Sequence, residues 1–117
     1  MTSVTHAGLA PTRTTLANGV VFVVKEAHTT PAVTINLGIR AGSICDPMDA
    51  PGAMYLLSRV IDRGTATRSA DEIADELDNR GIAVAVTVTR HVFSIVCTCL
   101  AEHFEVVFAL LDRKSVV

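Results

Sequence analysis

The sequence predicts an α+β domain in which a mixed, mainly antiparallel sheet carries helices on one face. Half of the 117 residues are apolar and 19% are charged, which is the composition of a folded chain with a real core. Segments with apolar residues at every second position, typical of strands, occur on either side of segments with helical spacing. Turn residues separate these segments, and the resulting order is β-β-β-α-α-β-β-α.

Three extended segments are expected in the first part of the chain. Residues 1–12 form a loose leader. The dipeptide Asn18-Gly19 is a strong hairpin signal because both residues tolerate positive φ, and residues 20–25 form the second arm of that hairpin. Residues 32–40 alternate between apolar and polar, which predicts a half-buried strand. Its inward side chains are Val33, Ile35, Leu37 and Ile39.

Two helices are expected next, after a loop at 42–52 that is rich in glycine and proline. The first spans 53–62, with an apolar stripe formed by Met54, Leu57 and Ile61, and Gly64 ends it. The second begins with a capping box, in which Ser69 is followed three residues later by Glu72. It carries Ile73 and Leu77 inward and stops at Gly81.

Two strands and a last helix complete the pattern. Residues 82–89 and 92–100 alternate as strands do, and Arg90-His91 lies at the reversal between them. Residues 102–113 have helical spacing. The apolar face of this helix is formed by Phe104, Val107, Phe108 and Leu111.

Composition excludes some classes of function. The net charge is −2, no Trp is present and no block of basic residues occurs, so nucleic-acid binding has little support. Cys97 and Cys99 lie two apart in a predicted strand, which is not a zinc spacing, and we expect two buried thiols in a reducing compartment. Cys45 is expected to be a free thiol in a loop. Because no signal peptide or membrane span is evident, the cytoplasm is the expected location, with the periplasm left open.

Several short motifs follow one another in a specific order. Residues 16–20 read L-A-N-G-V, residues 41–43 read A-G-S, and residues 52–65 read G-A-M-Y-L-L-S-R-V-I-D-R-G-T. The capping box at 69–73 follows. Together they resemble the L-x-N-G, A-G-S and G-x-x-H-F-L-E-H-x-x-F-x-G-T segments of the pitrilysin/insulinase-type peptidases, which include the mitochondrial processing peptidases and their bacterial relatives. The resemblance runs from Thr14 to Leu111 and implies a processing-peptidase-like domain.

The same resemblance shows that the zinc-binding residues are missing. In active members, the two His of H-x-x-E-H bind zinc, the Glu acts as general base, and a later Glu is the third protein ligand. Tyr55, Ser58 and Arg59 stand at those positions here. Neutral Tyr is a poor ligand, Ser is no general base and Arg stays charged. We therefore expect no catalytic and no metal-binding residue in this chain.

Two further observations agree with a lost site. The four histidines, which are scattered along the chain, are His6, His28, His91 and His103. Active members often have an Asn-Ala pair in the strand that lines the cleft, whereas this chain has Ala85-Val86. The three altered positions on the motif helix have two interpretations. They are either a repurposed peptide-contacting face or the result of drift on a helix that still packs, and we favour drift because polar helix faces are mostly solvated.

The resemblance implies a role in a pair. Family members usually act as two homologous halves or subunits, of which one carries zinc and the other helps to enclose the peptide. We expect this chain to be the non-catalytic one, with a zinc-bearing homologue and a shared peptide as its partners. The alternatives are a structural subunit of a larger complex and a zinc metalloendopeptidase with an altered site.

The resemblance also bears on the extent of the chain. Residues 13–111 correspond to the amino-terminal part of a longer, here truncated, domain. Residues 112–117 read D-R-K-S-V-V and resemble the in-frame translation of a short-read sequencing adapter. The hypothesis is that this tail is not native, and the nucleotide sequence decides it.

Overall fold

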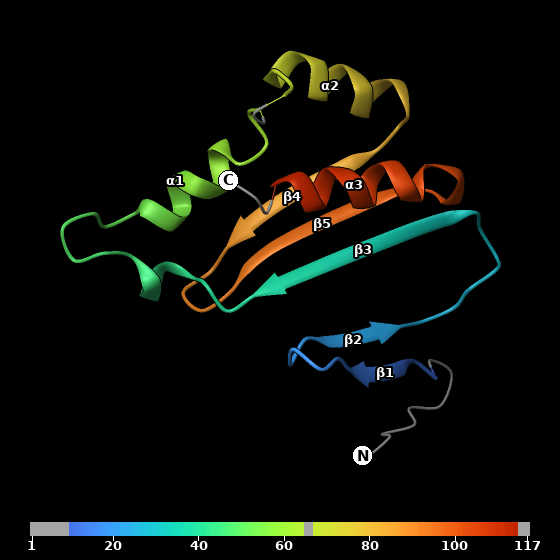
Figure 1. The fold of residues 1–117 in the computed structure, drawn as a ribbon, viewed down its shortest axis with the longest axis horizontal. Helices are drawn as coiled ribbons and strands as arrows, with labels where there is room; N and C mark the ends of the chain where they lie inside the picture. Colours follow the sequence, from blue (N-terminus) through green and yellow to red (C-terminus); the bar gives the residue numbers. More distant parts are fainter. Residues whose placement is uncertain (1–9, 65–66, 115–117) are drawn as a thin grey trace. The chain divides into compact units, whose positions relative to one another are not determined.

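The computed structural model describes residues 10–64 and 67–114, and it confirms the α+β class and the predicted order of elements (Figure 1). The helices and strands are β1 (Thr12–Thr15), β2 (Val21–Val24), β3 (Ala32–Ile39), α1 (Ala53–Val60), α2 (Ala70–Asn79), β4 (Ala83–Val88), β5 (Phe93–Leu100) and α3 (Phe104–Lys114). The chain divides into two compact units between Thr30 and Pro31. Every strand pair in the described part is antiparallel.

The first unit contains a hairpin made of β1 and β2. Its turn differs from the two-residue turn expected from Asn18-Gly19. The Leu16 N–H donates to the Val20 carbonyl at 2.8 Å, and the Gly19 N–H donates to the Leu16 carbonyl at 3.0 Å, so three residues form the loop. Only Gly19 has a positive φ, at 88°. A three-residue hairpin loop of this kind needs only one residue in the left-handed region, at its last position. Gly19 takes that position, so Asn18 keeps a negative φ.

The second unit contains a three-stranded sheet in the order β3-β5-β4. In its register, Cys97 of the central strand lies between Ile35 of β3 and Val84 of β4. Alternate residues of β5 therefore point to one face and are buried there: Phe93, Ile95, Cys97 and Cys99. The other face carries small and polar side chains together with Val96 and Leu100, and on it the hydroxyls of Thr34 and Thr98 lie 3.3 Å apart.

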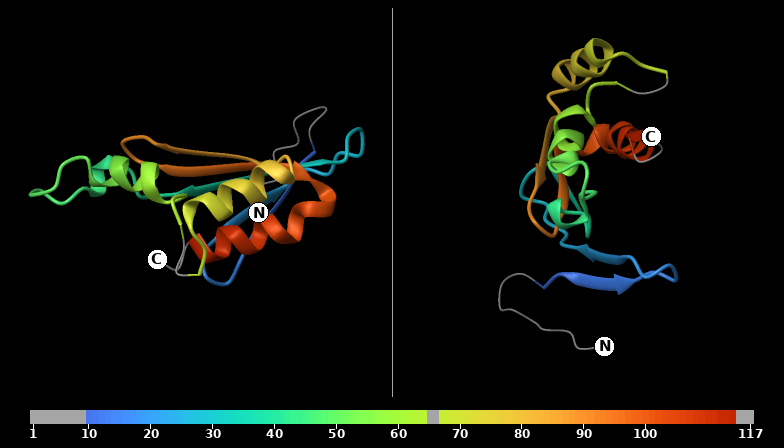
Figure 2. Two further views of the ribbon diagram at one scale, coloured as in Figure 1. Left: turned by 90° about the horizontal axis from the view of Figure 1, so that it is seen from above. Right: turned by 90° about the vertical axis from the view of Figure 1, so that its left-hand side faces the viewer.

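Helix α3 lies over the apolar face of this sheet, with α2 on the same side and α1 beside the end of β4 (Figure 2), and all three contribute to the core. Met54 of α1, Leu77 of α2 and Val107 of α3 all contribute to the cluster built on β5. Val33 and Ile35 of β3 also pack against it, as predicted. The other two residues predicted on that face of β3, Leu37 and Ile39, are exposed, although Ile95 and Phe93, which lie opposite them on β5, are buried.

The inner face of α3 is turned relative to the predicted one. Val107 and Leu110 are buried, whereas Phe108 is 55% exposed. Phe108 follows Val107 by one step of about 100° around the helix, which carries it off the buried stripe. Its ring instead stacks on Phe104, with 5.8 Å between ring centroids.

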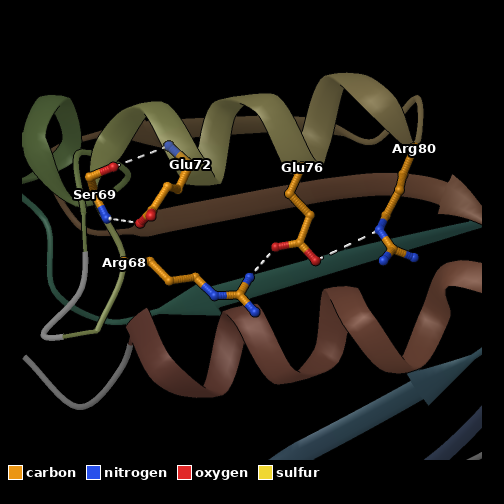
Figure 3. Close-up of polar contacts among 5 residues, drawn as sticks. All are labelled: Arg68, Ser69, Glu72, Glu76 and Arg80. Atoms are coloured by element: carbon orange, nitrogen blue, oxygen red, sulfur yellow. Dashed lines mark hydrogen bonds and ion pairs between the residues drawn. The ribbon is translucent and has the colours of Figure 1, made fainter.

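Helix α2 confirms the predicted capping box (Figure 3). The Ser69 hydroxyl accepts the Glu72 N–H at 3.2 Å, and the Glu72 carboxylate accepts the Ser69 N–H at 2.8 Å. Further along the helix, Glu76 forms ion pairs with Arg68 and Arg80. Ile73 is fully buried, so α2 presents its apolar side inward as the spacing predicted.

The three cysteines lie as predicted. Cys97 and Cys99 are buried on the helix side of β5, and Cys45 is exposed with a free thiol. Burial raises the pKa of the Cys99 thiol above its ordinary value. Within the described residues, we find no helix with the length and apolar character needed to cross a bilayer.

The predicted leader and tail lie at the two ends of the sequence. Residues 1–9 of the predicted leader lie outside the described residues, and β1 begins at Thr12. Helix α3 continues through part of the predicted tail to Lys114, and residues 115–117 lie outside the described residues. The hypothesis that the tail is foreign stays a prediction.

Candidate functional site

The A-G-S segment ties the loop before α1 to the turn between β4 and β5. The Ser43 N–H donates to the Thr89 carbonyl and the Ile44 N–H to the Arg90 carbonyl, both at 3.0 Å. Gly42 is buried between them, and a Cβ built there would lie 2.3 Å from the backbone carbonyl of Arg90. Only glycine fits this close approach of two backbones.

An aspartate from the same loop then fixes the start of α1. Its two carboxylate oxygens accept the N–H groups of Gly52 and Met54, each at 2.8 Å. These are two of the N–H groups that a helix leaves unsatisfied at its first turn. Gly52 itself has a φ of 87° and no side chain to cap with. Asp46 therefore caps α1 from outside the helix, a role that the local sequence pattern did not indicate.

The orientation of α1 differs from the predicted one at two positions. The residues of this helix region that contribute to the core cluster are Met54 and Ile61, and Ser58, which lies between them, is buried with 7% exposure. Leu57, predicted to face inward, is exposed. The Ser58 hydroxyl donates to the Tyr55 carbonyl at 2.6 Å, and this bond removes the penalty of burying a hydroxyl. Ser58 is thus not part of a solvated helix face.

The other two altered motif positions lie on the outer side of α1. Tyr55 is 56% exposed, and the Arg59 guanidinium carbon lies 5.1 Å from the centre of its ring. This is the distance of a cation–π contact, which holds the guanidinium in a preferred place while leaving its N–H groups available. Arg59 also lies in the last turn of α1, where a positive charge interacts favourably with the negative end of the helix dipole.

A groove of about 300 Å³ lies between α1 and β4. The residues that line it are Ser58, Arg59, Asp62, Arg63, Val84, Ala85 and Val86. The structure thus brings together two of the three altered motif positions and the Ala85-Val86 pair that replaces Asn-Ala. Tyr55 is not in the lining and reaches the groove only through its contact with Arg59. The motif comparison pointed to four of these residues and missed Asp62, Arg63 and Val84, although Asp62 follows Ser58 by one helical turn.

The strand that borders the groove, β4, is an edge of the sheet formed by the described residues. The Thr89 N–H donates to the Val92 carbonyl at 2.8 Å. This bond identifies which residues of β4 are hydrogen-bonded to β5, namely every second residue counted back from Thr89. In an antiparallel ladder only alternate residues bond to the neighbouring strand. Val84 and Val86 therefore direct their N–H and C=O groups away from β5, on the groove side. Such an unpaired edge is a template for another extended chain.

The donor set on α1 does not fit a zinc ion. Zinc in proteins is held by thiolate, imidazole and carboxylate, and the motif positions offer a phenol, a hydroxyl already donated to the helix backbone, and a guanidinium. Within residues 10–64 and 67–114, no three His, Cys, Asp or Glu side chains gather where they could hold a metal ion. Ser58 and Arg59, the two motif positions in the lining, supply neither a metal ligand nor a general base.

The histidines do not approach the groove as a set. His28 contacts Glu26 at 2.8 Å in the first unit, and His103 lies 3.6 Å from Glu102. His91 is exposed in the turn between β4 and β5, as predicted. His6 lies outside the described residues.

Comparisons with known proteins agree with the motif analysis. The family described as insulinase (peptidase family M16) matches residues 21–114. The chain is 38% identical over 77 residues to the mitochondrial-processing peptidase subunit alpha of Solanum tuberosum, which covers 66% of this chain and 15% of that protein. It is 31% identical over 91 residues to the uncharacterized zinc protease YmxG of Bacillus subtilis, which covers 78% of this chain and 22% of that protein.

Proposed function

Because the chain belongs to the insulinase family of peptidases (family M16), we propose that it acts as a non-catalytic half or subunit of a zinc metallopeptidase pair. Its role is to bind peptide and to assemble with a homologous, zinc-bearing partner. This chain itself carries no cofactor, and the zinc belongs to the partner.

One observation carries this proposal. The groove between α1 and β4 borders an edge strand of the described sheet, while Ser58 and Arg59 in its wall lack the chemistry to hold zinc or to activate water. Binding and catalysis have separate requirements, because an edge strand binds through its backbone whereas hydrolysis needs particular side chains. The groove fits the first requirement and not the second.

The proposed binding mode is strand addition. A peptide in extended conformation pairs with the outward N–H and C=O groups of Val84 and Val86. Ala85 alternates with them and presents only a methyl group. Backbone pairing is independent of sequence, which suits a subunit that presents varied peptides to an active partner.

Two observations support assembly with a partner. The potato relative is by its name one subunit of a processing peptidase. In addition, large apolar side chains are exposed along α1, including Tyr55, Leu56 and Val60. Exposed apolar surface of this kind is typical of contacts with other protein.

The first test measures bound zinc in the natural gene product that contains this chain, after a wash with a mild chelator. We expect no zinc in the wild type, and zinc bound by the variant Tyr55→His/Arg59→His, which restores two imidazoles one turn apart. Tyr55→Phe/Arg59→Gln serves as the control and should stay free of zinc. A tightly held zinc in the wild type would overturn the proposal.

The second test separates the proposal from its alternatives. We expect the protein to bind an extended peptide without cleaving it, and cleavage to appear only when the zinc-bearing homologue is added. Cleavage by the protein alone, abolished by chelator, would instead favour a peptidase with an altered site. Co-purification in a large complex without any affinity for peptide would favour a structural subunit.

We also propose the cytoplasm as the location, on the sequence grounds given above. Cell fractionation with an antibody against the protein tests this, and recovery in the periplasmic fraction would contradict it.

A further inference from the structure

We infer that the groove between α1 and β4 selects extended segments that carry an acidic side chain. This inference rests on the proposed function, since it names the class of peptide that the groove prefers. It follows from the charges of the lining and from the way a guest strand would present its side chains.

The charged side chains of the groove are unbalanced. Arg59 and Arg63 contribute two guanidinium groups, and Asp62 contributes one carboxylate. Arg63 lies 3.9 Å from Asp62, and both side chains are largely exposed, so this ion pair is weak. The Arg59 guanidinium rests on the Tyr55 ring, which carries no charge. The groove therefore keeps a net positive charge that a carboxylate can neutralise.

The position of this charge fits the geometry of strand addition. Arg59 and Arg63 come from α1 and the turn that follows it, whereas the outward backbone groups come from Val84 and Val86. Side chains of a guest strand alternate between the two faces of the sheet. Those on the helix-covered face point toward the two arginines. Arginine binds carboxylate through paired N–H groups, so one Glu or Asp at such a position gains a charge-assisted contact.

A basic guest is disfavoured for the same reason. Lys or Arg at that position meets two like charges and only one carboxylate, which Arg63 already contacts. Like charges brought together in a groove repel, and a partly enclosed site screens them less than open surface does.

The experiment uses short, fluorescently labelled peptides that alternate Val and Thr, with one central position occupied by Glu, Gln or Lys. Binding to the natural gene product is measured by fluorescence anisotropy at low and high salt. We expect the Glu peptide to bind about fivefold more tightly than the Gln peptide, with the Lys peptide weakest. The difference should shrink at high salt.

Variants locate the effect. Arg59→Gln/Arg63→Gln should bind the Glu and Gln peptides equally, and Arg13→Gln, an exposed arginine on β1, is the matched control that keeps the wild-type preference. Because all three arginines are exposed, the variants should unfold at the wild-type urea concentration. A Gln peptide with N-methyl groups at alternate residues should lose binding in every variant.

The outcomes distinguish the two proposals. Equal binding of all three peptides to the wild type would overturn the acidic preference and leave peptide binding in place. A Glu preference that survives in Arg59→Gln/Arg63→Gln would place the charge elsewhere and overturn this inference. Failure of every peptide to bind would overturn the proposed function as well.

Discussion

At the scale of single residues, Gly42 decides how the loop before α1 meets the sheet. Its conformation is ordinary, with φ of −82°, so the need for glycine comes from space and not from backbone strain. The backbone at Arg90 and His91 occupies the place of its Cβ. The conformational reason usually given for a glycine in a loop does not apply here.

Gly42→Ala should lower the free energy of unfolding by roughly 3 kcal/mol, because backbone must move to admit the methyl group. Gly38→Ala is the control. A Cβ at Gly38 meets only a Val92 side-chain carbon at 3.9 Å, and we expect a change within about 0.5 kcal/mol. Urea unfolding followed by circular dichroism measures both, and equal effects would contradict the close approach at Gly42.

Cys99 gives stability a dependence on pH. Burial raises the pKa of its thiol above the ordinary value of 9.0. The folded chain then holds this proton at a pH where the unfolded chain has released it. The stabilisation is fully present below the unfolded pKa and is lost as pH rises through the folded pKa.

We therefore expect the free energy of unfolding to fall as pH rises above about 9. Cys99→Ala should show a smaller fall over the same range, and Cys45→Ala, which removes an exposed thiol, should show the wild-type fall. The measurement is urea unfolding across a pH series. Parallel curves for wild type and Cys99→Ala would contradict the assignment.

At the scale of elements, the inner faces of helices α1 and α3 differ from the inner faces predicted from the spacing of their apolar residues. In α1, Ser58 is buried and Leu57 is exposed. In α3, Leu110 is buried and Phe108 is exposed. Hydrophobic spacing predicts that a helix has an inner stripe, but two neighbouring stripes in an apolar-rich helix differ by a single step of rotation. The partner surface then selects between them.

Val107→Ala and Phe108→Ala test the orientation of α3. Val107→Ala leaves a cavity in the core and should lower the free energy of unfolding by about 2 kcal/mol. Phe108→Ala removes the larger side chain but only the ring contact with Phe104, and should lower it by about 1 kcal/mol or less. Thermal or urea unfolding measures both losses. A larger loss for Phe108→Ala than for Val107→Ala would support the inner face predicted from the sequence.

At the scale of the whole molecule, the core belongs to the second unit alone. Every buried apolar residue of the described chain lies between Ile73 and Leu110, while residues 10–30 are exposed throughout. A two-stranded hairpin is marginal by itself, whereas the three-stranded sheet has helices to cover it. The stability of the chain is therefore expected to reside in the second unit.

A chain of residues 31–117 should unfold cooperatively, with a free energy of unfolding within about 1 kcal/mol of that of the full chain. Circular dichroism and urea unfolding of the two chains make the comparison. Loss of the cooperative transition on removal of residues 1–30 would show that the hairpin contributes to the core.

The same division by scale separates what the sequence foretold from what it did not. Local signals were sufficient for the order of strands and helices, the capping box at Ser69 and the turn at Arg90-His91, because each depends on residues close together in the chain. The motif comparison singled out Ser58, Arg59 and Ala85-Val86 as altered positions of one site. The motif comparison did not show that these residues line one groove, or that Asp62 and Arg63 contribute further charged side chains to it.

The amino-acid sequence by itself determined the fold class, the family resemblance and the donor groups that Tyr55, Ser58 and Arg59 offer at the three motif positions, because residue identity alone fixes which donors a position has. Only the tertiary structure decided that Ser58 is buried, that the loop at Gly42 meets the backbone at Arg90, and that β4 is an edge strand of the described sheet beside the groove. These features depend on the rotation of a helix, the path of a loop and the order of strands in a sheet. Each of them is set by packing between segments far apart in the chain, which no local pattern records.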